Sequence, residues 1–369
     1  MVAGVSTIAV VSGSAVAFCP AAGSAQGAGL VASSGAEKLN GVSCTSATAC
    51  FAVGESFAKS VPDKTLVERW NGKAWSIVPS ANPTGGGVLN AVSCTSATFC
   101  MAVGVHGASK TSYSSAVVER WNGKTWSIVA SPSAVQRDLS SVSCTSATFC
   151  FAIGGGIERW DGTKWSIAKG VRVSPTTVSC ASTTACFGVN GLADAARWNG
   201  KTWLAIPAPQ SQPGSEGFGL NGVSCPSSTT CFAVGSNGVG AGSFDPLVER
   251  WDGKRLSLVP SPGGDYFNAV SCASPISCAA VGIFDTPGDF GPRQNPMAEQ
   301  WNGATWSEVT SPAPAGTYGP INGVSCTSRT NCFAVGYTQL LLGPNDNFGP
   351  PHTFIQQWNG TNWSTVASP

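Results

Sequence analysis

Apolar and polar positions follow the same order seven times along this chain. Each copy opens with a short alternating run ending in Val-Ser-Cys. An apolar run follows, then a run that ends in Trp, an Asn-Gly or Asp-Gly pair and usually a second Trp. Four short strands separated by turn residues are typical of one propeller blade, and a repeat of roughly 35–55 residues is typical of a β-propeller. We therefore predict an all-β fold, a seven-bladed β-propeller with four antiparallel strands per blade.

The repeat also predicts the domain organisation. We expect residues 39–369 to form the propeller, with residues 26–38 as a short linker before it. The predicted blades are approximately 39–83, 89–133, 139–174, 175–209, 220–262, 267–313 and 321–369. Residues 1–25 are uncharged and rich in small residues, so we interpret them as an export signal-like leader. A membrane anchor is the alternative, but Gly and Ser are too frequent there for one.

Two turn residues carry a prediction about backbone geometry. Asn71-Gly72 indicates a two-residue type I′ turn in which both residues have positive φ. That register would place Trp70 and Trp75 on one face of the blade, in diagonal contact. A Gly such as Gly54 closes the second strand in most copies and is replaced by Asn190 in the fourth, which again indicates positive φ.

The cysteines predict one disulfide per blade. Fourteen of the 15 fall six residues apart in pairs, whereas Cys19 lies in the leader. Cysteines that flank a five-residue loop can meet as the closing pair of a hairpin, and the spacing does not match zinc sites. The expected pairs are Cys44 with Cys50, Cys94 with Cys100, Cys144 with Cys150, Cys180 with Cys186, Cys225 with Cys231, Cys272 with Cys278, and Cys326 with Cys332. We expect no cofactor and no metal. An even number of paired cysteines indicates an oxidising compartment, so we expect a secreted, extracellular protein.

Composition narrows the possible partners. The net charge is +1 and charged residues make up 11% of the chain, so the basic excess that binds nucleic acid is missing. Forty-five glycines and 24 prolines beside 13 tryptophans indicate a turn-rich β protein with a packed core. We expect a monomer without membrane contact beyond the leader.

Three repeated features admit a structural and a functional interpretation. The tryptophans could stack on a ligand, but Leu256 replaces one of them, which favours packing between blades. The Glu-Arg pair before the first Trp could form a functional ring, but its loss in other copies favours paired charges between blades. A polar residue opens the first strand of every blade, and these side chains could either bind a ligand at one mouth of the channel or tie down the preceding loop. They are Asn40, Asn90, Ser140, Thr176, Asn221, Asn268 and Asn322.

Loop lengths point to one face of the disc as the binding face. Loops between the second and third strands, and between blades, share one face and vary in length; this is the variable-loop face. The longest segments there are 283–298 and 337–354. Aromatic and charged residues gather in those of blades 5–7, and carboxylates beside aromatics suit carbohydrate or peptide recognition. The candidate ligand-binding residues are Asp245, Tyr266, Asp285, Asp289, Arg293, Tyr318, Tyr337, Asp346 and His352, beside Phe244, Phe290 and Phe348.

Parts of the repeat resemble known propeller families. Phe-Ala-Ile-Gly-Gly at 151–155, followed by Trp, resembles the kelch repeat of galactose-oxidase-like propellers. Gly-Lys-Thr-Trp at 123–126 resembles the end of the Asp-box of sialidase-type propellers, with Trp121 where that motif has Asp. The whole unit is most similar to the Cys-paired repeats of secreted bacterial propeller proteins, over about residues 39–369. This resemblance implies the fold and not the chemistry.

Two functions remain open at this level. The first is a secreted binding or interaction module for a glycan or protein ligand on the variable-loop face of blades 5–7. The second is an extracellular glycan-active enzyme, a glycoside hydrolase or sialidase-like protein, that uses loop carboxylates. A sialidase would need an arginine cluster, and these loops offer mainly Arg293. We favour the binding module and assign no catalytic residue.

Overall fold

A computed structural model describes residues 35–57, 62–107, 115–132, 138–168, 174–191, 194–207, 209, 218–240, 243–286, 293–343 and 347–369. The chain divides into two units, Met1–Leu30 and Val31–Pro369, and the second contains all described residues. The predicted leader and Cys19 lie outside the described residues. The first strand begins at Ala36, so the last three residues of the predicted linker belong to the first blade.

Seven antiparallel sheets form the blades of this second unit. Blade 1 contains β1 (Ala36–Ser46), β2 (Ala49–Phe57), β3 (Lys64–Trp70) and β4 (Trp75–Ile77). Blade 2 contains β5 (Gly87–Ser96), β6 (Phe99–His106), β7 (Ser115–Trp121) and β8 (Trp126–Ile128). Blade 3 contains β9 (Leu139–Ser146), β10 (Phe149–Gly154), β11 (Ile157–Trp160) and β12 (Trp165–Ile167). Blade 4 contains β13 (Thr177–Ser182), β14 (Ala185–Val189), β15 (Ala195–Trp198) and β16 (Trp203–Ile206).

The last three blades have longer strands. Blade 5 contains β17 (Phe218–Ser227), β18 (Thr230–Gly240), β19 (Ser243–Trp251) and β20 (Leu256–Leu258). Blade 6 contains β21 (Tyr266–Ser274), β22 (Ser277–Thr286), β23 (Arg293–Trp301) and β24 (Trp306–Val309). Blade 7 contains β26 (Ile321–Ser328), β27 (Asn331–Gly343), β29 (His352–Trp358) and β30 (Trp363–Val366), extended by β25 (Thr317–Tyr318) and β28 (Asn347–Phe348).

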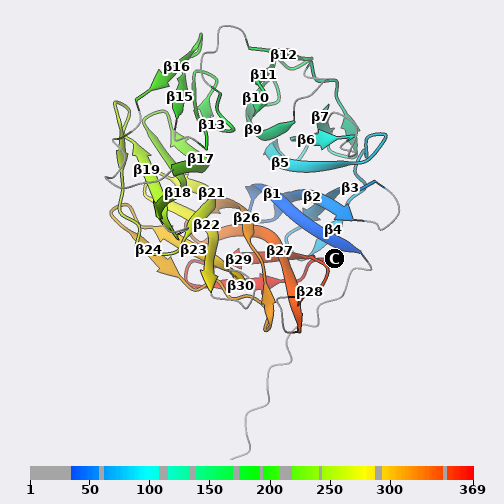
Figure 1. Ribbon diagram of the computed structural model, residues 1–369. Coiled ribbons are helices and arrows are strands. Elements are labelled where there is room, and N and C mark those ends of the chain that lie inside the picture. Colours follow the sequence, from blue (N-terminus) through cyan, green and yellow to red (C-terminus); the bar gives the residue numbers. More distant parts are fainter. Residues whose placement is uncertain are drawn as a thin grey trace, which may run out of the picture. The chain divides into compact units, whose positions relative to one another are not determined.

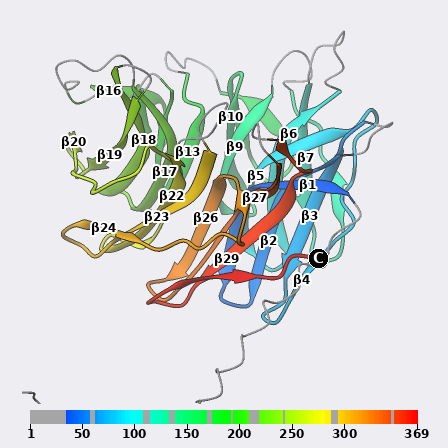
Figure 2. The same ribbon diagram turned by 60° about the horizontal axis from the view of Figure 1, so that its bottom comes forward.

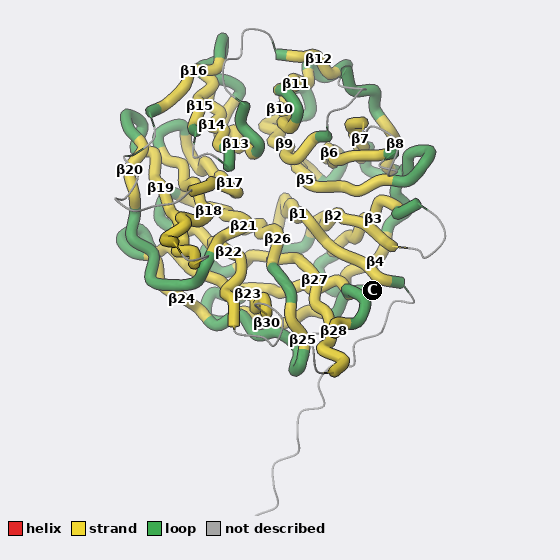
Figure 3. The backbone as a smooth tube through the Cα atoms, in the orientation of Figure 1, coloured by secondary structure: helices red, strands yellow, loops and turns green. Residues whose placement is uncertain are grey.

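The blades surround a central axis (Figure 1). The first strand of each blade lies innermost and the fourth lies at the rim. Figure 2 shows β26, β27 and β29 of the last blade beside β1, β2 and β3 of the first, and the described part of the chain contains strands and loops without helices (Figure 3). The predicted seven-bladed propeller with four strands per blade is confirmed. The two cysteines of every blade are joined, as predicted, and Cys44 faces Cys50 in the β1–β2 ladder.

The serine of each Val-Ser-Cys joins neighbouring blades. The main-chain N–H of Cys94 in blade 2 donates to Ser43 Oγ of blade 1 at 2.9 Å. The same bond recurs at every joint, and at the last one Cys44 N–H donates to Ser325 Oγ at 3.0 Å. Whole blades therefore close the ring without sharing a strand.

The tryptophans pack between blades, as the sequence predicts. Trp70 and Trp75 of blade 1 lie 5.1 and 5.4 Å from the ring centre of Phe333 in blade 7. All three side chains are buried. Phe51 of blade 1 contacts the two tryptophans of blade 2 in the same way. Leu256 occupies the corresponding place in blade 5 and is also buried, so the position requires apolar volume.

The prediction of charge pairs between blades is wrong. Glu68 is fully buried, and its carboxylate accepts hydrogen bonds from Ser368 Oγ of blade 7 at 2.9 and 3.0 Å. Ser80 donates to Glu119 and Ser261 donates to Glu299 in the same manner. The neighbouring arginines stack on aromatic rings instead; the Arg69 guanidinium lies 5.7 Å from the ring centres of Phe51 and Trp121.

The turn between the third and fourth strands differs from the type I′ prediction. Trp70 pairs directly with Trp75, so the loop has four residues, and only Gly72 has positive φ. Asn71 Oδ1 accepts the N–H groups of Lys73 and Ala74, an Asx turn that the two-residue register does not include. The tryptophans share a face as predicted, but they lie opposite each other and not diagonally.

The glycine that closes the second strand has another role than the one predicted. The φ of Gly54 is not positive, and this residue lies opposite a β-bulge between Leu39 and Gly41. A Cβ on Gly54 would lie 1.9 Å from the carbonyl oxygen of Lys38. In blade 4 the β13–β14 ladder ends at the pair of Thr177 and Val189, so Asn190 follows the strand and has no bulge paired opposite it. The requirement is therefore close approach of two backbones.

Candidate functional site

The two longest variable segments are extensions of hairpins. β22 and β23 stay paired as far as Thr286 and Arg293, and β27 continues to Gly343. β25 and β28 both pair with this end of β27. Where the structure describes them, the segments predicted as surface loops are therefore largely strands that extend the blades on the variable-loop face. Several apolar side chains of these extensions are exposed, with Leu340 at 48% and Leu342 at 58%.

The predicted residues near the joint of blades 5 and 6 form an aromatic and acidic cluster. Phe244 packs edge-on against Tyr266, with ring centres 5.9 Å apart, and Gln294 Nε2 donates to Tyr266 Oη at 3.2 Å. Asp265 Oδ2 accepts the main-chain N–H of Asp285. Burial, and then the nearby Asp265 carboxylate, raises the pKa of Asp285, whose buried Oδ1 has no hydrogen-bond partner among the described residues.

A second cluster lies where blade 6 meets the added strand β25. The Arg293 guanidinium lies 5.6 Å from the ring centre of Tyr318. Tyr318 packs against Phe348 of β28, with ring centres 6.0 Å apart. A guanidinium over an aromatic face is held by the ring quadrupole, so this stack has a defined geometry.

A third cluster lies where blade 7 meets blade 1. Lys38 Nζ lies 4.5 Å from the ring centre of Tyr337 and 5.2 Å from that of Phe57. Burial raises the pKa of Tyr337, and the Glu55 carboxylate raises it further. Burial also raises the pKa of Glu55, against the opposing effect of Lys38.

Five of the nine candidate ligand-binding residues therefore fall into three clusters at successive joints: Tyr266, Asp285, Arg293, Tyr318 and Tyr337. Asp245 is exposed in β19, where it pairs with Asn237, and His352 pairs with Thr338 where β29 begins. Asp289, Phe290 and Asp346 lie outside the described residues. Sequence reasoning missed Asp265, Gln294, Glu55, Phe57 and Lys38. Lys38 was assigned to the linker, and only the strand pairing of residues 36–38 reveals its place.

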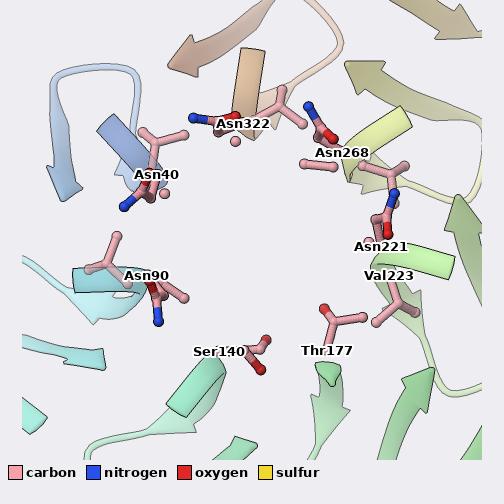
Figure 4. Close-up of a pocket in the computed structure, with 18 of the residues that line it drawn as sticks. Asn40, Asn90, Ser140, Thr177, Asn221, Val223, Asn268 and Asn322 are labelled. Carbon is pink, nitrogen blue, oxygen red and sulfur yellow. The ribbon is translucent and has the colours of Figure 1, made fainter. Parts of the chain in front are cut away.

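A cavity of about 360 Å³ lies on the propeller axis (Figure 4). Its upper layer, toward the variable-loop face, contains the polar residues that open the first strands. Six valines two positions further along these strands line the cavity deeper in the channel. They are Val42, Val92, Val178, Val223, Val270 and Val324. No charged side chain lines the described cavity.

Five asparagines of the upper layer, here called the amide collar, link consecutive blades. Asn40 Nδ2 donates to the main-chain oxygen of Leu89 at 3.0 Å, and Asn322 Nδ2 donates to that of Leu39 at 2.9 Å. Asn90, Asn221 and Asn268 do the same. Their amide nitrogens point around the ring toward the next blade in Figure 4. The predicted tie to the preceding loop is thus a tie to the neighbouring blade.

Comparison with known proteins supports the fold. No family model and no curated protein sequence matches the chain. Among solved structures, the WD40 repeats of RRP9 align with 83% of this chain and 88% of that chain, at 11% identity and a TM-score of 0.55. YCF48 from Cyanidioschyzon merolae aligns with 83% and 95%, at 11% identity and a TM-score of 0.54. A GH74 xyloglucanase from Xanthomonas campestris aligns with 90% of this chain and 55% of its own length, at 13% identity and a TM-score of 0.55. These similarities establish the propeller and not the function.

No three His, Cys, Asp or Glu side chains in the described ranges gather in a way that could hold a metal ion. The same part of the chain contains no helix long and apolar enough to cross a membrane.

Proposed function

We propose that this protein is a secreted binding module whose ligand, a peptide or a glycan, contacts the variable-loop face of blades 5–7. The observation that carries the proposal is the asymmetry of the disc. Every turn on one face is short and nearly identical, whereas the other face has hairpin extensions with exposed aromatic and aliphatic side chains. Exposed apolar groups beside fixed polar groups are typical of recognition surfaces. Seven disulfides fit the oxidising environment outside the cell.

Removal of one extension tests this proposal. Deleting residues 339–351 and joining Thr338 to His352 by two glycines preserves the last ladder pair of β27 and β29. We expect the blade to fold, since a surface extension contributes little to stability, but ligand capture from a peptide and glycan array to be lost. Exchanging the Asn71-Gly72 turn on the opposite face is the control. If the deletion variant captures ligand fully and the turn variant does not, the ligand binds the face of the Asn71-Gly72 turn and the proposal is wrong.

A glycan-active enzyme is the second candidate, and one observation favours it. Asp285 lies beside Asp265 and has a raised pKa, as a general acid requires. The test is release of reducing sugar from a panel of glycans. Release by the unmodified protein that is lost in both Asp265→Asn and Asp285→Asn would favour catalysis over binding. If the unmodified protein binds glycans of that panel without cleaving them, an enzymatic function on those glycans is excluded.

A further inference from the structure

The amide collar offers hydrogen-bond acceptors to the cavity. Each Nδ2 donates to a main-chain carbonyl, which can only accept, so the orientation of each side-chain amide is fixed. The five Oδ1 atoms have no hydrogen-bond partner among the described residues, and none belongs to the buried unpaired atoms there. Solvent therefore reaches them, and they present oxygen acceptors around the mouth.

The side-chain hydroxyls of the lining lie only in blades 3 and 4, at Ser140, Ser141, Thr176 and Thr177. The Ser140 hydroxyl is directed to main-chain oxygens of Ile153 and Thr176, whereas Ser141 Oγ accepts the N–H of Val178 and keeps its own proton. In the other five blades a ligand at the collar faces amide oxygens. A carboxylate or phosphate would thus lose its hydration at the collar and gain little in return. A group with several donors suits the collar, and a protonated amine with three donors suits it best.

The deeper part of the cavity selects what is attached to that amine. Below the collar the side chains of the lining are apolar, with small residues such as Ala91 and Ala269 above the valine layer. A sugar carries hydroxyls on every side, and those beside the valines would stay unpaired. An aliphatic group attached near the amine would bury against the valines while the amine remains at the collar.

Charge on the variable-loop face favours the same ligand. Described carboxylates around this face outnumber the cations: Glu55, Asp63, Asp245, Asp265 and Asp285 stand against Lys38, Lys64 and Arg293. A cationic end group is attracted toward such a surface before it reaches the channel.

We propose that the axial cavity binds the free N-terminus of a peptide whose first residue is aliphatic. The α-ammonium group donates to the amide collar, and the first side chain contacts the valine layer (Figure 4). The rest of the peptide extends toward the aromatic clusters of blades 5–7. This inference rests on the proposed function and names the ligand class for it.

Three tripeptides test this proposal against the unmodified protein by calorimetric titration. Leu-Gly-Gly should bind, N-acetyl-Leu-Gly-Gly should bind about tenfold more weakly because a charge-assisted donor is lost, and Gly-Gly-Gly should also bind about tenfold more weakly. Equal affinity for the free and the acetylated peptide would overturn the proposal, and so would equal affinity for the Leu and Gly peptides.

A filled channel provides the second test. Ala91→Leu with Ala269→Leu adds volume inside the cavity, and we expect Leu-Gly-Gly binding to fall about tenfold or more. Ala74→Leu with Ala304→Leu adds the same volume at exposed turn positions and should leave binding unchanged. Near-UV circular dichroism verifies folding, and the single change Ala91→Leu serves if the double variant fails to fold. Unchanged affinity in the filled protein would overturn the proposal.

The deletion of residues 339–351 separates this inference from the proposed function. If array ligands depend on that extension but bind the filled channel normally, the variable-loop face binds them and the axial cavity does not. If the deletion leaves array binding intact while channel filling abolishes Leu-Gly-Gly binding, the axial site stands alone.

Discussion

At the scale of single residues, the buried glutamates govern how stability depends on pH. Burial raises the pKa of Glu68 to about 8 and those of Glu249 and Glu299 to about 7, from an ordinary value of 4.5. Each side chain is almost inaccessible to solvent. The folded protein therefore holds protons that the unfolded chain releases above about pH 4.5, and stability falls as the pH rises toward the folded pKa. Gln356 takes this position in blade 7, and its amide does not titrate, so this blade adds no such pH dependence.

Glu249→Gln should remove part of this pH dependence. Glu249 Oε2 has no hydrogen-bond partner among the described residues, so the charged form is poorly stabilised. The contribution of the neutral carboxyl is fully present below about pH 4.5 and lost as the pH rises through about 7. We expect the variant to gain roughly 2 kcal/mol at pH 8 and almost nothing at pH 4. Melting temperatures across this range, with the exposed Asp245→Asn as control, provide the measurement; parallel curves for wild type and Glu249→Gln would contradict the assignment.

At the scale of elements, the β-bulge in the innermost strand fixes which residue can close the second strand. The bulge brings the backbone of β5 against Gly104, and a Cβ there would lie 1.9 Å from the carbonyl oxygen of Val88. A contact with backbone cannot be relieved by a rotamer change, so the strand pair itself would have to move.

Gly104→Ala should therefore destabilise the protein strongly, by roughly 3 kcal/mol. Gly191→Ala is the matched control, because no atom lies within 4 Å of a Cβ there, and we expect no loss of stability. Thermal denaturation of both variants measures the difference. Equal melting temperatures for the two variants would contradict this prediction, because the β5–β6 pair would then accommodate a Cβ at the bulge without loss of stability.

The elements were predictable from sequence where their determinants are local. Cys44 and Cys50 lie in one hairpin, and the apolar runs mark the strands that hold them. The roles of Ser43 and Glu68 were not predictable, because their partners lie in another blade, 51 and 300 residues away in the chain. The three clusters on the variable-loop face were predicted only as a set of residues. The place of Lys38 in the third cluster was not predictable, because nothing in residues 36–38 alone indicates that β1 pairs there with β2.

At the scale of the whole molecule, the joint of blades 4 and 5 has fewer hydrogen bonds between described residues than the other joints. Thr176 Oγ1 donates to Val189 within its own blade, so the bond of the amide collar is missing between blades 4 and 5. Glu249 Oε2 has no hydrogen-bond partner among the described residues, unlike the serine-bound carboxyl groups of Glu68, Glu119 and Glu299. The bonds of Cys225 to Ser179 and of Leu220 to Asn190 remain.

Hydrogen exchange should reveal this joint as the first to open. We expect amides of β13 and β17 to exchange faster than those of β1 and β5, because local opening follows the weakest set of contacts. Thr176→Asn supplies the missing side-chain amide of the collar and should slow exchange in β17. Uniform protection of all seven innermost strands would mean that aromatic packing, and not hydrogen bonding, sets the opening of the ring.

The hydrogen bond from a cysteine N–H to the serine of the preceding blade has the same direction at every joint. Each blade accepts through its serine from the blade that follows, and blade 7 accepts from blade 1 by the same bond. The joint without a covalent connection therefore has the same serine bond as the six that have one. In topological terms the fold is a cycle, and the break in its backbone could lie at another joint without altering how any blade meets its neighbours.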